Sequence, residues 1–120
     1  MASSETIVQY IVIRSDLTKE FQWSLGAVMA QACHASCAAI HTYYKDPFVQ
    51  DYLKQFQLMH KIILQVPDEN ALRSLATKLA DNDIKFWLWE EKPENVATCL
   101  ASKPGPRSTL KNHFRSLKLL

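Results

Sequence analysis

The stretch SLGAVMAQACHASCAAI, from Ser24 to Ile40, decides the fold because nearly all of its residues are small and none after Gly26 interrupts a helix. Ser24 can cap the first turn, and the Asp-Pro pair at positions 46 and 47 ends the pattern. The stretch therefore predicts a helix that reaches about Tyr43. We expect its small side chains to let this helix lie close against a sheet.

The rest of the chain alternates segments of strand and helix character. Strands are predicted where β-branched and aromatic residues gather, at Thr6 to Arg14, His60 to Val66, Ile84 to Glu90 and Val96 to Ser102. Further helices are predicted from Pro47 to Leu58, from the cap Asp68 to about Ala80, and from Arg107 to Leu120. The order βααβαββα predicts an α/β three-layer sandwich with a mixed four-stranded sheet, in which the third and fourth strands pair.

Length and composition indicate one soluble globular domain over residues 1–120, since 48% of the residues are hydrophobic and 22% are charged. The first residues lack the basic region of a signal peptide, and their apolar run is too short for a membrane segment. The 3 cysteines are an odd number, which fits a reducing compartment better than a disulfide framework. We therefore expect a cytoplasmic protein without membrane attachment.

Positive charge gathers near the C-terminus, because no Asp or Glu follows Glu94. Arg107, Lys111 and Arg115 are four residues apart, which on a helix forms a basic stripe. With Lys103 they are candidate contacts for a polyanion such as RNA. The competing interpretation is a solvated surface face.

The cysteines suggest three roles: metal ligand, nucleophile or packing residue. Cys33, Cys37 and His41 share one side of the predicted helix, but they are one ligand short of a closed zinc site. Cys33 and His34 are adjacent, so they point about 100° apart and do not face each other. We expect packing for these thiols and for Cys99. Motifs for phosphate loops or paired CxxC ligands are absent from the sequence, so no metal and no cofactor is predicted.

An acidic turn, WEEKPEN from Trp89 to Asn95, follows the predicted third strand. Strand ends are where α/β sheets commonly place a ligand crevice, so Glu90, Glu91 and Glu94 are candidates for a site. The alternative is an exposed, solvated turn. Trp87 and Trp89 alternate on that strand; we expect one in the core, while the other remains open as a core residue or a stacking platform.

Four segments together resemble the type 2 peptidyl-tRNA hydrolase family of archaea and eukaryotes. They are QYIVIRSDL from Gln9, GAVMAQACHA from Gly26, VPDENALRSLA from Val66, and PGP from Pro104 before a last segment that ends in LKLL. WSLGAVMAQACHA and PENVATC resemble more narrowly the divergent eukaryotic branch called peptidyl-tRNA hydrolase domain-containing protein. The resemblance covers about residues 7–120 and implies a mixed four-stranded sheet, often a homodimer, and hydrolysis of the ester that joins a peptide to the terminal ribose of tRNA.

The resemblance implies catalytic positions on the third and fourth strands. The family's aspartate at the end of the third strand matches Glu91, or Glu90 if the register shifts by one residue. The threonine that follows four residues later matches Asn95, and the threonine of the fourth strand is kept as Thr98. Ester hydrolysis needs a base for water and a donor for the oxyanion. Glu91 is thus the expected base, and Thr98 or Asn95 the expected group that orients the water or donates a hydrogen bond.

The first helix motif carries the remaining implied site residues. The family's glutamine and histidine are kept as Gln31 and His34, although each could also be a structural residue. The lysine that the family places after the glycine is Ala27 here, and Lys92 or Lys19 are the nearest replacements by sequence. Loss of one oxyanion donor costs roughly a hundredfold or more in rate. The resemblance thus implies a slow hydrolase; the alternatives are an inactive tRNA-binding module of the same fold and a cysteine-dependent hydrolase.

Overall fold

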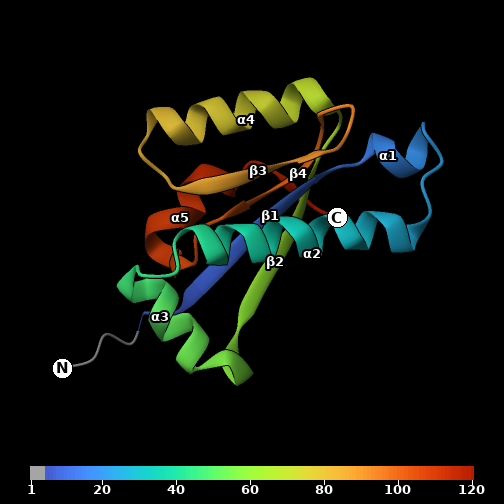
Figure 1. Cartoon of the computed structure of the whole chain (residues 1–120). Coiled ribbons are helices and arrows are strands. Elements are labelled where there is room, and N and C mark those ends of the chain that lie inside the picture. Colours follow the sequence, from blue (N-terminus) through green and yellow to red (C-terminus); the bar gives the residue numbers. More distant parts are fainter. Residues whose placement is uncertain (1–4) are drawn as a thin grey trace.

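The central sheet of the computed structural model, which describes residues 5–120, is mixed (Figure 1). Its strands are β1 (Ile7–Arg14), β2 (His60–Val66), β3 (Phe86–Glu91), β4 (Val96–Ser102), β5 (Gly105–Pro106) and β6 (Lys118–Leu119). The order is β3-β4-β1-β2-β6, and β5 pairs with β1. Within residues 5–120, only the pairing of β1 with β2 is parallel. The α/β fold, the mixed sheet and the pairing of β3 with β4 are confirmed, whereas the prediction of four strands is wrong.

The helices begin where the sequence supplies caps. They are α1 (Asp16–Lys19), α2 (Leu25–Thr42), α3 (Pro47–Lys54), the 3-10 turn η1 (Phe56–Leu58), α4 (Glu69–Asp81) and α5 (Arg107–Phe114). Ser24, Asp46 and Asp68 each accept a backbone N–H bond at the start of α2, α3 and α4. The predicted bounds of these three helices hold within a few residues, except that η1 takes the last turn expected of α3.

The C-terminal segment differs from the prediction of a helix to Leu120. Helix α5 ends at Phe114, and Lys118 and Leu119 pair with Gln65 and Leu64 of β2. Without this segment the outer edge of β2 would present unpaired backbone groups there, and a sheet edge takes up a nearby chain readily. The two-residue strands β5 and β6 thus complete edges of the sheet that local sequence patterns do not reveal.

Helices cover both faces of the sheet. On one face, α2 packs on β1 and β4 through a core that includes Ile11, Ala35 and Cys99. On the other, α4 and α5 pack on a larger core that includes Leu72 and Phe114. In Figure 1, α4 lies above β3 and β4, and α2 lies below these two strands and crosses β1 and β2. The small residues Ala35 and Ala39 of α2 are fully buried, as expected of a helix that lies close to a sheet.

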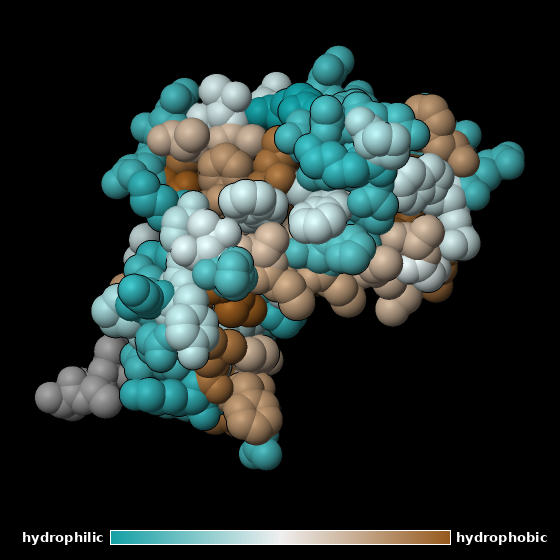
Figure 2. Space-filling view, viewed as in Figure 1, coloured by the Kyte–Doolittle hydropathy of each residue, from teal (hydrophilic) through white to brown (hydrophobic). Residues whose placement is uncertain are grey.

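The outer side of α2 corrects the expectation that all three cysteines are packing residues. Cys99 is buried, but Cys33 and Cys37 are exposed. Helix α2 buries positions 28, 31, 35, 36 and 39, and Cys33 and Cys37 fall on the opposite side. Exposed Leu25 and Met29 lie on α2 as well, and Figure 2 shows hydrophobic surface along this helix. Within residues 5–120, none of the helices has the length and apolar character needed to cross a bilayer.

Candidate functional site

Polar side chains converge where β3 ends, β4 begins and α2 passes beneath the sheet. Gln31 and His34 come from α2, Trp89 and Glu91 from β3, and Thr98 from β4. They lie on the α2 face of the sheet, near the end where the parallel strands β1 and β2 terminate. We call these five residues the Glu91 cluster. It brings together four of the five residues predicted to be catalytic; the fifth, Asn95, lies apart from it.

The carboxylate of Glu91 is held by two neutral donors. Gln31 Nε2 donates to Oε2 at 3.1 Å, and Trp89 Nε1 donates to Oε1 at 3.1 Å. Glu91 is half-buried, so its carboxylate also meets solvent. A carboxylate has about four acceptor positions, and two neutral donors leave others available for a water molecule. The arrangement fixes the direction of the carboxylate and keeps it able to accept a proton.

Thr98 orients Gln31 rather than facing solvent. Its hydroxyl donates to Gln31 Oε1 at 2.7 Å, and Thr98 is fully buried. Because Gln31 Oε1 accepts this bond, the amide NH₂ group is directed to Glu91, which can only accept when ionised. Thr98 therefore acts on Glu91 through Gln31.

A β-bulge turns Thr98 toward α2. In the pairing of β3 with β4, Trp89 lies opposite Cys99 and Glu90 opposite Ala97, so Thr98 is the extra residue. Cys99 belongs to the core on the α2 face, and strict alternation would therefore direct Thr98 to the α4 face. The bulge directs Thr98 and Cys99 to the same side instead and places Ala97 in the core beneath α4.

The two tryptophans of β3 differ in environment. Trp89 is half-buried against the α2 core and stacks on His34, with ring centroids 4.6 Å apart. Trp87 is 40% exposed. The expectation that one of them lies in the core fits Trp89. Its donor role toward Glu91 was missed, although an indole N–H on a half-buried strand needs an acceptor.

The remaining acidic candidates lie elsewhere. Glu90 faces α4, where its carboxylate accepts from Arg73 at 2.9 Å, so of the two register alternatives only Glu91 faces Gln31. Asn95 lies in the turn between β3 and β4, and its side chain accepts from Lys92 Nζ at 2.5 Å. Glu94 is exposed in the same turn.

Position 27 lies one helical turn before Gln31 on α2. Residues four apart on a helix have Cβ atoms about 5–6 Å apart, so a long side chain at Ala27 would reach the Glu91 cluster. Lys92 contacts Asn95, and Lys19 lies in α1. In the part of the chain that the structure describes, Glu91 forms no ion pair. The contacts of Glu91 are therefore those of a carboxylate without a cation.

A chain of ion pairs on the α4 side was not predicted. Arg14 binds both carboxylate oxygens of Asp16, at 2.7 and 2.9 Å, and approaches Glu69 at 3.5 Å. Arg73 joins Glu69 to Glu90, each at 2.9 Å. The hydrogen bonds to Asp16 raise the pKa of Arg14, and the backbone N–H of Ala97 is the main cause that lowers the pKa of Glu69. The sequence signal for these ion pairs was the charged residue Arg14 at the end of a mostly apolar strand.

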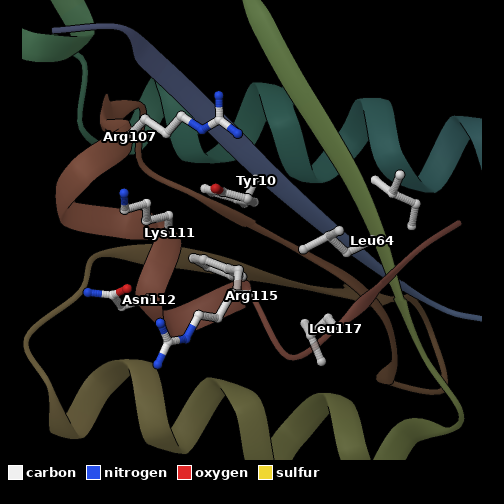
Figure 3. Close-up of a pocket in the computed structure, with 9 residues that line it drawn as sticks. Tyr10, Leu64, Arg107, Lys111, Asn112, Arg115 and Leu117 are labelled. Carbon is white, nitrogen blue, oxygen red and sulfur yellow. The ribbon is translucent and has the colours of Figure 1, made fainter.

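The basic residues divide between two places. Lys103 pairs with Asp46 at 2.7 Å, so its charge is compensated. Arg107 and Lys111 on α5, and Arg115 directly after it, lie beside a pocket of about 430 Å³, shown in Figure 3 with Tyr10 and Leu64. No acidic side chain of residues 5–120 lines this pocket. Tyr10 and Phe114 belong to the core on the α4 and α5 face, so these cations lie on the opposite face of the sheet from the Glu91 cluster.

The three thiols lack the surroundings of a reactive cysteine or a metal ligand. Burial raises the pKa of the Cys99 thiol, which disfavours a thiolate nucleophile. Cys33 and Cys37 lie on the outer side of α2, away from the Glu91 cluster. Within residues 5–120, no group of three or more His, Cys, Asp or Glu side chains is placed to hold a metal ion.

Sequence comparisons identify the family. The family model for peptidyl-tRNA hydrolase PTH2 matches residues 7–120. A human protein named "Putative peptidyl-tRNA hydrolase PTRHD1" is 41% identical over 119 residues, which is 98% of this chain and 85% of that protein. The mouse protein of the same name is 40% identical over 116 residues, which is 96% of this chain and 83% of that protein. The chain therefore belongs to the PTH2 family of peptidyl-tRNA hydrolases.

Proposed function

From this family membership, we propose that the chain hydrolyses the ester between a peptide, or an N-blocked amino acid, and the 3′ end of tRNA. The observation that carries the proposal is the geometry of Glu91, a half-buried carboxylate whose two oxygens accept from Gln31 and Trp89. Glu91 takes a proton from water as the water oxygen attacks the ester carbonyl. The bond between the carbonyl carbon and the ribose oxygen then breaks, Glu91 returns the proton to the ribose oxygen, and the peptide leaves with a free carboxyl group.

Each residue of the Glu91 cluster has a role in this proposal. Gln31 and Trp89 fix the direction of the carboxylate, and Thr98 fixes Gln31. The stacking of His34 on Trp89 supports the indole ring. Asn95 faces Lys92 in the turn, so its proposed contribution, to orient the water or the substrate, depends on its release from Lys92.

Turnover is expected to be slow because the oxyanion lacks a cationic donor: within residues 5–120, no cation pairs with Glu91. Backbone N–H groups at the first turn of α2 supply only a partial positive charge, about half an elementary charge. A lost oxyanion donor costs roughly 3–4 kcal/mol, or about a hundredfold to a thousandfold in kcat. Ala27, where a long side chain would reach this cluster, accounts for that deficit.

A second candidate function is a tRNA-binding module without turnover. Two observations favour it. Ala27 leaves Glu91 without an amine, and the segment from Arg107 to Arg115 places three cations beside a pocket that lacks acidic lining. Both functions share the proposal that these cations contact RNA phosphates, which makes binding depend on salt. Lys103, paired with Asp46, contributes less than the other three.

The deciding experiment measures cleavage of N-acetyl-aminoacyl-tRNA. Wild-type turnover should fall about a hundredfold or more in Glu91→Gln, while Glu94→Gln, an exposed glutamate of the same turn, should match the wild type. Ala27→Lys should raise kcat, whereas Met29→Lys adds the same charge on the outer side of α2 and should not. Turnover that survives Glu91→Gln would refute the assigned base. If the wild type binds tRNA without turnover while Ala27→Lys gains turnover, the protein is a tRNA-binding module and not a hydrolase.

A cysteine-free variant, with Cys33 and Cys37 replaced by serine and Cys99 by alanine, tests the remaining chemistry. We expect it to keep the wild-type turnover, and a loss larger than its loss of folded protein would favour a cysteine hydrolase.

We also propose that the protein is cytoplasmic and forms a homodimer. Three free cysteines favour a reducing compartment, and exposed Leu25 and Met29 on α2 offer an apolar surface for a second copy. Sedimentation equilibrium of the wild type against Met29→Lys tests the dimer: a monomer at all concentrations would contradict it.

A further inference from the structure

Beside the bulge at Thr98, the backbone N–H and C=O groups of Ala97 bind side chains and not β1. The ladder between β1 and β4 ends at Ile13 and Cys99, two residues before Ala97 is reached. The Ala97 N–H donates to Glu69 Oε2 at 3.0 Å, and the Ala97 carbonyl accepts from Arg14 Nη1 at 3.1 Å. Ala97 is fully buried, so both groups would otherwise be costly. Glu69 and Arg14 thus supply the hydrogen bonds that β1 would supply in a longer ladder.

From this arrangement we propose that Glu69 and Arg14 are positioning residues for hydrolysis, because together they hold the bulge that turns Thr98 toward Gln31. The inference rests on the proposed function. Neither residue touches the Glu91 cluster: they lie on the α4 side of the sheet and act through the backbone of Ala97.

The consequence of losing these bonds follows from strand alternation. If Ala97 returned to a regular register, Thr98 would turn to the α4 face. Gln31 Oε1 would then lose the hydroxyl that fixes it, and Gln31 Nε2 would no longer be directed at Glu91. The effect would therefore travel from Ala97 through Thr98 and Gln31 to the carboxylate.

Both side chains are themselves held in place. Arg14 is 6% exposed and binds Asp16 through two bonds. Glu69 is the first residue of α4, where a negative charge is favoured, and Arg73 donates to it at 2.9 Å. Glu69 is one-third exposed, which makes it the better target for substitution.

The test compares Glu69→Ala with Glu69→Gln, which keeps an acceptor oxygen for the Ala97 N–H. With N-acetyl-aminoacyl-tRNA, Glu69→Ala should lower kcat roughly tenfold to a hundredfold and leave KM within about twofold. Glu69→Gln should restore most of kcat, and Asn70→Ala, an exposed neighbour on α4, should match the wild type. In a Thr98→Val background, Glu69→Ala should have little further effect on kcat. Additive losses, or a Gln variant as impaired as the Ala variant, would overturn the proposal.

A second readout is independent of turnover. The side-chain amide resonances of Gln31, assigned by their loss in Gln31→Leu, should shift in Glu69→Ala to the positions that they take in Thr98→Val. If Glu69→Ala does not fold, Glu69→Asp shortens the same carboxylate and should give the same shift. Unchanged Gln31 resonances would refute the positioning role, whether or not the wild type is an enzyme. A shift in a protein without turnover would support the positioning role and contradict only the proposed hydrolysis.

Discussion

The replacement of Thr98 by valine tests the geometry of the Glu91 cluster most directly. Valine has nearly the same volume as threonine but no hydroxyl, so Gln31 Oε1 loses its donor at 2.7 Å. Gln31 is 3% exposed, and water cannot readily replace the bond. An unsatisfied buried acceptor costs about 1–3 kcal/mol, which in a chain of this length lowers Tm by roughly 4–12 °C.

Guanidinium chloride unfolding, followed by tryptophan fluorescence, measures this loss. Thr109→Val, at an exposed position of α5, is the matched control and should change the free energy of unfolding by less than about 0.5 kcal/mol. The double variant Thr98→Val, Gln31→Met removes both partners and should lose less than the sum of the single variants. A Thr98→Val protein as stable as the wild type, or strict additivity, would refute the proposed bond.

Three further predictions concern charged groups. Asp16→Asn leaves the buried Arg14 guanidinium with a weaker partner and should cost about 3–5 kcal/mol in thermal unfolding; a loss below about 1 kcal/mol would contradict the buried ion pair. Because its folded pKa is lowered, Glu69 contributes stability above its unfolded pKa of about 4.3, and this is lost as pH falls through the folded pKa. Unfolding measured from pH 7 to 2 should therefore show a smaller acid-induced loss in Glu69→Gln than in the wild type. Arg107→Glu with Lys111→Glu should weaken tRNA binding and lower the salt slope by about two; an unchanged slope would exclude this surface.

Local signals predicted the elements that carry the site. Ser24 caps α2, β2 and β4 have the predicted bounds, and the acidic turn follows β3 as expected. These features depend on caps, periodicity and β-branched residues, which are properties of neighbouring residues. The edge strands β5 and β6 depend on distant partners, so nothing in their two-residue sequences indicates them.

The details of the site could not be predicted from local sequence patterns, because they depend on residues that are distant in the sequence. VATCLAS, the sequence of β4, has the pattern of a regular strand, whereas the bulge at Thr98 adjoins contacts of Ala97 with Glu69 and Arg14, which are distant in the sequence. That bulge also decides which side of the sheet Thr98 faces. Likewise, the spacing of the basic residues predicted the stripe on α5, but the pairing of Lys103 with Asp46 joins positions 57 residues apart.

Under the proposed function, the placement of charge separates RNA binding from chemistry. The cations of α5 and the carboxylate of Glu91 lie on opposite faces of the sheet. Glu91 is a carboxylate held by neutral donors, so no cation paired with it attracts a phosphate, whereas the pocket beside α5 has no carboxylate to act as a base. RNA affinity from α5 would therefore persist when Glu91 is neutralised, and an amine placed at Ala27 would act mainly on the rate. Because the two contributions are physically apart, loss of the amine would lower turnover without lowering binding. Separate measurements of turnover and binding therefore distinguish a slow hydrolase from a binding module.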